Sequence, residues 1–424
     1  MRCEMMGTRS KDETMLESLR ALDLTNEQGF FCGRILADLG VDVIKVEKPG
    51  GDPARNINPF YKDRITSETS LFWFAYNANK RGITLNIESR DGKKILKRLV
   101  KTADFVIESF PCGYMDDLSL GYSVLSEVNP KIIMASITPF GTTGPYKNYK
   151  SCELVNMAMS GLMNLSGDPD RPPVMISFPH ACLNAGAQAA VAMLAAGYWR
   201  EKTGKGQHID VAIRESIIQM IAQPIAHWTI NRVRIRRAGQ HRIGWGPGLV
   251  RQIWPCKDGF VIFLLGGGGA RARTNKALMD WMDGEGMAGD FLRQVDWQSF
   301  DMAKTTEDFI RPLEDAIGKF FLTHTKAELF TGGAERHVDI YPVNDCRDIA
   351  EEIQLKERDY WTEVEHPELG IHVTYPGTFV RSSEIWAGVR HRAPRIGEHN
   401  EEIFTKELGF SHAELALLKQ THII

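Results

Sequence analysis

The stretch LADLGVDVIKVEKPGGDPAR, residues 36–55, is the clearest indication of the fold of this chain. It joins the end of a helical segment to an apolar run over 41–47 through Gly40, and a glycine-rich loop follows. Glycine commonly closes a helix. A short run rich in valine and isoleucine is typical of a strand buried on both faces. This stretch therefore predicts a helix that leads into a strand of a parallel sheet.

The same alternation extends over the first half of the chain. Helical segments over 30–40 and 90–103 lie between apolar runs that predict strands over 19–25, 41–47, 82–88, 104–110 and 131–141. Strands separated by helices of this length form a parallel sheet covered on both faces. Right-handed crossovers place all the carboxyl ends at one edge, where ligands bind. The fold class is therefore α/β, with a Rossmann-like large domain.

The residue composition and the alternation of strands and helices change after residue 224. Residues 225–260 are basic and glycine-bearing, and a small α+β unit with a run of four glycines follows. We predict three parts: residues 1–224 as the N-terminal part of the large domain, 225–335 as a linker and small domain, and 336–424 as a return linker and the C-terminal part of the large domain.

Composition excludes several classes of protein. The net charge of −3 gives no sign of a nucleic-acid or membrane partner. The small-apolar run 187–198 is too short to cross a bilayer, and residues 1–13 lack an apolar signal core, so we expect a cytoplasmic protein. The seven cysteines form no CxxC pair, which argues against zinc or a disulfide framework. The first strand-to-helix turn, 26–30, lacks the GxGxxG pattern that a dinucleotide requires.

Several ordered blocks resemble the class III CoA-transferase family, which includes formyl-CoA, carnitine and bile-acid CoA-transferases. The blocks are ALDLT (21–25), LADLGVDVIKVEKPGGDPAR (36–55), NANKRGITLNI (77–87), ADFVIESF (103–110), ITPFGTTGPYKNYKSCELVNMAMSGLMNLSGDPDRPPV (137–174) and AAGYWREKTGKGQHIDVAIRES (195–216). The resemblance implies an interlocked-ring dimer of two-domain chains. It also implies a coenzyme A thioester as substrate, no permanently bound cofactor, and an aspartate nucleophile that forms a mixed anhydride and then an aspartyl-CoA thioester.

The resemblance assigns four cations to the coenzyme A phosphates: Lys48, Arg55, Lys80 and Lys150. Each also fits an ordinary solvated surface cation, the usual state of Lys and Arg. Three departures weaken the expected site, because Ser109, Asp117 and Glu27 stand where the family has Asn, Arg and Gln. An added acid near the phosphates would repel them.

The nucleophile is the largest departure. The family's aspartate lies four residues before a glycine, and this sequence has Cys182 before Gly186, with no Asp or Glu anywhere in 171–200. A cysteine nucleophile would need a depressed pKa and a base such as His180. The alternative, which we favour, is a small buried residue that fills the aspartate's space. Glu153 matches an acidic family position. Cys152 stands where the 2-methylacyl-CoA racemases, which belong to the same family, have His.

Two hypotheses remain. In the first, this chain is the non-catalytic subunit of a heteromeric CoA-transferase whose homologous partner carries the aspartate; the resemblance implies succinyl-CoA as donor and an aryl- or alkylsuccinate as acceptor. In the second, it is a homodimeric acyl-CoA-binding or regulatory protein, or a cysteine-dependent acyl-CoA enzyme. A run of glycines, Gly266, Gly267, Gly268 and Gly269, resembles the family's mobile lid loop, and it fits a plain strand-to-helix turn equally well.

Overall fold

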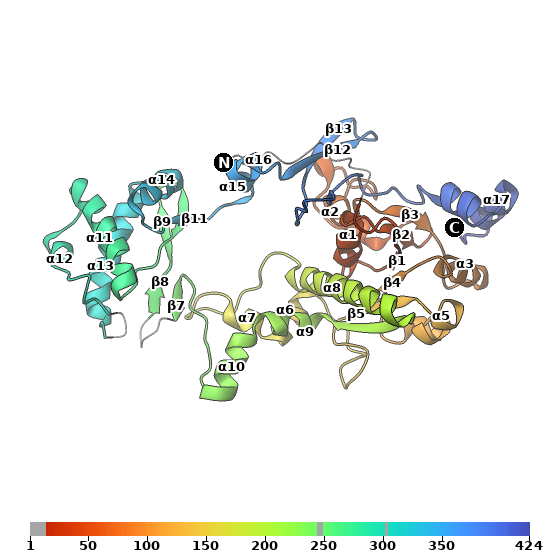
Figure 1. Ribbon diagram of the computed structural model, residues 1–424, viewed down its shortest axis with the longest axis horizontal. Helices are drawn as coiled ribbons and strands as arrows, with labels where there is room; N and C mark the ends of the chain where they lie inside the picture. The colour runs from red at the N-terminus through yellow and green to blue at the C-terminus, as the bar shows by residue number, and fades with distance from the viewer. Residues whose placement is uncertain (1–13, 244–248, 302–303) are drawn as a thin grey trace. The chain divides into compact units, whose positions relative to one another are not determined.

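A computed structural model describes residues 14–243, 249–301 and 304–424 (Figure 1). Residues 1–13, on which the localisation prediction rests, lie outside the described residues, as do residues 244–248 of the basic, glycine-bearing segment 225–260. The chain forms two compact units. Unit 1 runs to Leu162 and includes Ile176–Ala226 and Gln354–Ile424, and unit 2 comprises Met163–Met175 and His227–Ile353. The segment 163–175, which the sequence prediction gave to the large domain, therefore belongs to unit 2.

A six-stranded parallel sheet in the order β3-β2-β1-β4-β5-β6 forms the centre of unit 1. The predicted α/β class with a parallel sheet is confirmed. Its strands are β1 Arg20–Leu24, β2 Asp42–Glu47, β3 Arg81–Thr84, β4 Phe105–Glu108, β5 Ile133–Thr138 and β6 Gln207–Ala212. The strand order reverses between β1 and β4. A crevice at the carboxyl ends of these two strands is the usual ligand position in such a sheet.

Helices cover both faces of this sheet. One face packs against α3 (Arg90–Val100), α5 (Tyr122–Val128) and α17 (His412–Gln420), through Leu96, Leu125 and Leu415 among others. On the other face α8 (His180–Thr203) contacts α1 (Phe30–Asp38), β5 and β6. The two helices approach closely at Gly186, where a Cβ atom would lie 3.0 Å from the backbone nitrogen of Cys32. This glycine fixes how the first turn of α8 sits beside α1.

Shorter elements complete unit 1. The C-terminal part returns as an antiparallel hairpin of β12 (Trp361–His366) and β13 (Ile371–Pro376). The remaining helices of unit 1 are α2 Leu71–Asn77, α4 Tyr114–Asp117, α6 Glu153–Ser160 and α9 Ile213–Met220. Helices α10 Ala222–Asn231 and α16 Ile353–Glu357 contain residues of both units, and α15 Cys346–Glu351 belongs to unit 2. Ser70 begins α2 by accepting a hydrogen bond from the backbone N–H of Trp73, as an N-cap residue does.

Unit 2 is a small α+β unit with its own core. Three antiparallel strands pack against helices, and Trp254, Phe320 and Phe321 are fully buried between them. Its elements are β9 Ile253–Cys256, β10 Gly259–Ile262, β11 Tyr341–Pro342, the hairpin β7 His241–Ile243 and β8 Leu249–Arg251, and helices α7 Leu162–Leu165, α11 Gly269–Gly284, α12 Asp290–Arg293, α13 Glu307–Leu322 and α14 Lys326–Arg336. Among the helices of the described residues, none is long and apolar enough to span a bilayer.

Candidate functional site

A cavity of about 490 Å³ opens at the carboxyl edge of the sheet, where the strand order reverses. Three loops line it, and each follows a different strand: the loop after β1 with Asn26 and Gln28, the loop after β4 with residues 109–112, and the loop after β5 with Pro139 and residues 147–151. This is the position that the topology of a doubly wound sheet predicts for a ligand.

Hydrogen bonds tie the β1 and β4 loops together beneath the cavity. The backbone N–H of Asn26 donates to the Ser109 hydroxyl at 2.9 Å, and that hydroxyl donates back to the Asn26 side-chain oxygen at 2.9 Å. The backbone N–H of Gln28 donates to the same side-chain oxygen at 3.0 Å. Ser109 thus joins two of the loops that line the cavity.

Two exposed lysines in the β5 loop supply the cavity's positive charge. Lys147 and Lys150 both line it, and neither ammonium group has an ion-pair or hydrogen-bond partner within the described residues. The aromatic rings of Tyr146 and Tyr149 lie 5.1 Å apart in the same loop. Free cations next to a cavity are what an anionic phosphate ligand requires. Lys150 was predicted from the sequence, and Lys147 was not.

Arg55 has its donors occupied by protein groups. Its side chain is completely buried and forms a two-bond ion pair with Glu47, at 2.6 and 2.7 Å. It also donates to Glu68 and to the carbonyl of Pro394, and its guanidinium stacks 3.9 Å from the centre of the Trp73 ring. These contacts join β2, α2 and the C-terminal part of unit 1. A direct bond from Arg55 to a phosphate would require this network to open.

Lys80 is buried in the same manner. Its ammonium group donates to the Asp23 carboxylate at 2.8 Å, to the carbonyl of Phe30 at 3.0 Å and to the Asn77 side chain at 2.9 Å. An ammonium group has three N–H donors, and all three of those of Lys80 have protein acceptors, so none remains for a ligand. Burial lowers the pKa of Lys80 to about 8, against the opposing effect of Asp23.

The other charged positions singled out in the sequence lie on the surface. Lys48 is exposed and pairs with Glu88 at 2.9 Å. Asp117 is exposed at the end of α4 and does not line the cavity. Glu27 is exposed in the turn before α1, where its charge acts on the first turn of α8. Of the four predicted phosphate contacts, Lys150 is the one that borders the cavity.

Cys182 lies in the first turn of α8, and Glu153 at the start of α6 caps that turn. The Glu153 carboxylate accepts the backbone N–H of Ala181 at 2.6 Å and that of Cys182 at 3.3 Å. The first backbone N–H groups of a helix have no partner within it and favour a negative charge. Glu153 therefore already occupies the donors that would otherwise stabilise an anion at position 182.

The Cys182 thiol is held in its neutral form. It is 6% exposed, and burial raises its pKa, an effect that the carboxylates of Glu153 and Glu27 reinforce. No hydrogen bond joins His180 to this thiol among the described residues. A reactive cysteine requires the opposite environment, one with a depressed pKa and nearby positive charge.

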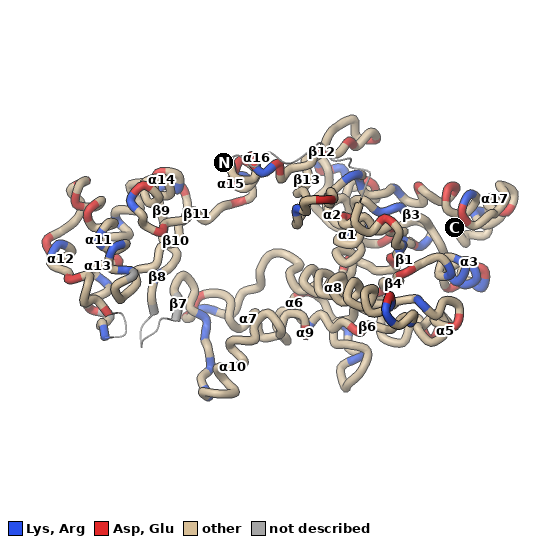
Figure 2. The backbone as a smooth tube through the Cα atoms, viewed as in Figure 1, with Lys and Arg blue, Asp and Glu red and all other residues tan. Residues whose placement is uncertain are grey.

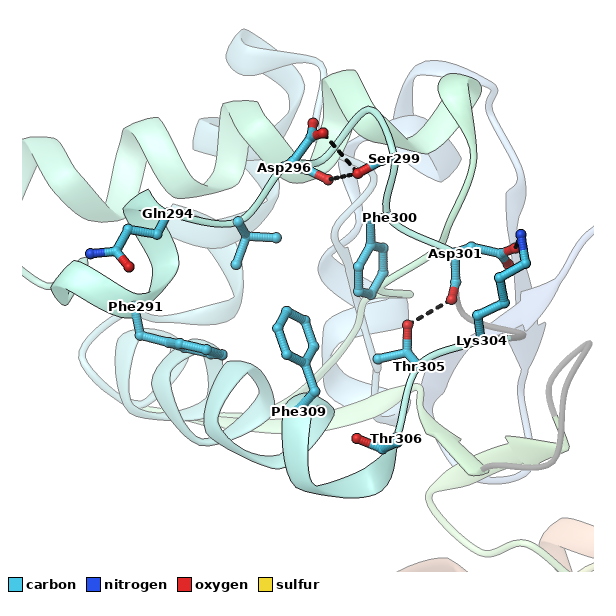
Figure 3. Close-up of a pocket in the computed structure, with 11 residues that line it drawn as sticks. Phe291, Gln294, Asp296, Ser299, Phe300, Asp301, Lys304, Thr305, Thr306 and Phe309 are labelled. Carbon is cyan, nitrogen blue, oxygen red and sulfur yellow. Dashed lines mark hydrogen bonds and ion pairs between the residues drawn. The ribbon is translucent and has the colours of Figure 1, made fainter.

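Unit 2 contains the glycine run and a separate cavity. Gly266–Gly268 connect β10 to α11, Gly269 begins that helix, and Gly268 has a φ of 83° with open space where a Cβ would lie. The cavity, of about 560 Å³, is lined by Phe291, Phe300 and Phe309, whose rings point toward one another in Figure 3. Among the described residues that line it, Lys304 is the one lysine and there is no arginine, so this cavity is poorly suited to a polyphosphate.

Comparison with known proteins identifies the family. The family model "CoA-transferase family III" matches residues 16–400. The chain belongs to this family. It is 32% identical to the Succinyl-CoA:(R)-benzylsuccinate CoA-transferase subunit BbsE of Thauera aromatica, over 93% of this chain and 95% of that protein. It is 31% identical to the Succinyl-CoA–D-citramalate CoA-transferase of Chloroflexus aurantiacus, over 96% and 98%. A crystal structure of a CAIB/BAIF family protein from Brucella suis matches with a TM-score of 0.81 at 28% identity, covering 93% of this chain and 99% of that one.

Family membership agrees with a cavity at the switch point of the sheet. Sequence reasoning missed Asn26, Gln28 and Lys147 in the cavity wall. Their positions in loops that follow predicted strands were the available signal, because loops at the carboxyl edge converge.

Proposed function

We propose that this chain is the non-catalytic subunit of a heteromeric class III CoA-transferase. Its partner would be a homologous chain that carries the aspartate nucleophile. The complex would move coenzyme A from an acyl-CoA, with succinyl-CoA as the favoured donor, to a carboxylic acid, with an aryl- or alkylsuccinate as the favoured acceptor. The similarity to a protein named as a benzylsuccinate CoA-transferase subunit supports both the subunit role and the substrate class.

The observation that carries this proposal is the state of Cys182. The family's chemistry needs a nucleophile that forms an anhydride with the acyl group and then a thioester with coenzyme A. A buried thiol with a raised pKa beside the Glu153 carboxylate supplies neither. The same observation disfavours a cysteine-dependent enzyme, because the thiolate is the reactive form.

The exposed face of α8 supports a partner of the same fold. From His180 to Trp199 this helix has no Asp, Glu, Lys or Arg, and Figure 2 shows it tan along nearly all of its length. Val191, Tyr198 and Trp199 are 69%, 67% and 57% exposed. These positions follow helical spacing and form one apolar stripe opposite the buried face. A helix that is apolar all round is normally covered on all sides.

Coexpression with an aspartate-bearing homologue tests the subunit role. We expect a stable complex that transfers coenzyme A from succinyl-CoA to benzylsuccinate, and no transfer by this chain alone. Cys182→Ala in the complex should leave transfer within about twofold, because the thiol takes no part in the chemistry. Full activity of the isolated chain, or loss of activity in the intact Cys182→Ala complex, would show that the proposal is wrong.

We also propose that the cavity at the carboxyl edge holds the phosphates of coenzyme A through Lys150 and Lys147. Lys150→Ala should weaken coenzyme A binding about tenfold, the usual effect of losing one charge-assisted phosphate contact. Lys131→Ala is the matched control, since Lys131 is exposed just before β5 at the opposite edge of the sheet. Equal affinity of the two variants would refute the assignment of Lys150.

A further inference from the structure

A buried carboxyl group, that of Glu108, lies directly behind the wall of the carboxyl-edge cavity. Glu108 is the last residue of β4 and is 5% exposed. Its carboxylate accepts the backbone N–H of Phe110 at 2.7 Å, and Phe110 lines the cavity. The side chain that shapes this part of the wall is therefore a titratable group with almost no access to water.

Polar and acidic groups from three neighbouring elements surround Glu108. On β5, Ser136 is its register partner, and the Ser136 hydroxyl lies 2.9 Å from Nε2 of His208 on β6. The carboxylates of Asp116, on α4, and Asp210, on β6, act on Glu108 electrostatically. Asp210 in turn accepts the backbone N–H of Thr142 at 2.9 Å, in the loop that continues to the cavity lysines.

These surroundings bring the pKa of Glu108 close to neutral pH. Burial raises the pKa of Glu108 to about 7, and Asp116 and Asp210 add to the rise, while the Ser136 hydroxyl and the Phe110 N–H oppose it. The cation of Lys45 is buried elsewhere and pairs with Asp23. The main influences on Glu108 from the described part of the chain include no lysine or arginine. Burial lowers the pKa of the nearby His208. A further negative charge nearby would favour the protonated form.

We propose that Glu108 takes up a proton when an anion such as the coenzyme A phosphates enters the cavity, so that binding strengthens as the pH falls through neutrality. This proposal rests on the proposed coenzyme A site. The Glu108 carboxyl group can accept the Phe110 N–H whether it is protonated or ionised. Phe110 therefore keeps its place in the cavity wall when protonation removes the buried charge. Glu108 is thus a positioning residue that also couples ligand charge to protonation.

The expected size follows from proton linkage. If the ligand raises the pKa of Glu108 by one unit, about 0.4 proton is taken up at pH 7, and affinity is about fivefold higher at pH 6 than at pH 8. Glu108→Gln keeps an oxygen for the Phe110 N–H and removes the titration. Coenzyme A also titrates, because a phosphate has a second pKa near 6. The quantity to compare is therefore the difference in proton uptake, and in the pH dependence of coenzyme A affinity, between the wild type and Glu108→Gln.

Titration calorimetry with coenzyme A, on the full chain at pH 6, 7 and 8 in two buffers of different ionisation enthalpy, tests the proposal. We expect the wild type to take up more protons than Glu108→Gln and to show the steeper pH dependence. Equal uptake by two binding-competent proteins would overturn the proposal and leave the coenzyme A site intact. A wild type that binds no coenzyme A at any pH would instead refute the site, and the proposal with it.

An infrared measurement on the wild type alone covers the case in which Glu108→Gln fails to fold or bind. Coenzyme A has no carboxyl group, so an increase of the protonated-carboxyl band on its addition at pH 7 reports protonation of the protein. We expect that increase. A spectrum without it, at a coenzyme A concentration that saturates the cavity, would overturn the proposal.

Discussion

Replacement of Lys80 by methionine separates a structural role from a ligand-binding role. The Lys80 and Asp23 side chains are both fully buried, and their charged groups are 2.8 Å apart. Removing one partner of such a pair leaves an uncompensated charge, which usually costs 3–5 kcal/mol. Lys45, 3.9 Å from Asp23, and the Thr25 hydroxyl, 2.6 Å from it, remain as partial compensation. We therefore expect a loss of about 3 kcal/mol, at the lower end of that range.

Urea denaturation followed by circular dichroism measures this loss in the free energy of unfolding. Hydrogen exchange of the backbone amides in β1 and α1 shows whether these elements are the ones destabilised. Lys94→Met is the matched control. Lys94 forms an ion pair with Asp91 of the same length, 2.8 Å, but both side chains are about 60% exposed, so its removal should leave the midpoint unchanged. An unchanged midpoint for Lys80→Met, together with lost coenzyme A binding, would refute the structural reasoning and restore Lys80 as a ligand.

Three further predictions follow from the site. Glu108→Gln should match the wild type in stability at pH 5 and exceed it by up to about 3 kcal/mol at pH 8. The reason is that folding raises the pKa of Glu108 from its usual 4.5 to about 7, so its contribution to stability is present below pH 4.5 and is lost as the pH rises through 7. Equal pH profiles of the two proteins in urea denaturation would contradict this prediction. Cys182→Asp should lower the melting temperature more at pH 8 than at pH 5, because it adds a carboxylate beside Glu153; a pH-independent change would exclude charge repulsion. Trp199→Ser should weaken assembly with the homologous partner in sedimentation at least tenfold, whereas an unchanged complex would place the interface elsewhere.

Five of the six strands of the sheet were predicted from the sequence. The clearest signals come from β2, β4 and β5, which are largely apolar, as burial on both faces of a parallel sheet favours. β6 was missed for a physical reason. It is one of the two edge strands of the sheet, its sequence QHIDVA mixes polar and apolar residues, and its first four positions alternate between half-buried and exposed. An edge strand of this kind lacks the pattern that identifies a central one.

The cationic part of the site was much less predictable. Arg55 and Lys80 lie in loops of the kind that often bind phosphates, and nothing local shows that Glu47 and Asp23 already pair with them. Those pairs form between separate elements and appear only when the sheet and its helices are assembled. Lys150 was assigned through the family resemblance, and it borders the cavity in the loop that follows β5.

The substitution of Cys182 is best understood together with Glu153. In the family's active chains an aspartate at this position must stay anionic while it waits for an acyl-CoA, and a helix N-terminus favours that charge. Here Glu153 accepts the N–H groups of Ala181 and Cys182, so the positive end of α8 is already neutralised. A second carboxylate would meet repulsion without a donor of its own, whereas a neutral thiol fits the space at no electrostatic cost. The first turn of α8 is thus arranged for packing, as the proposed non-catalytic role of this chain would require.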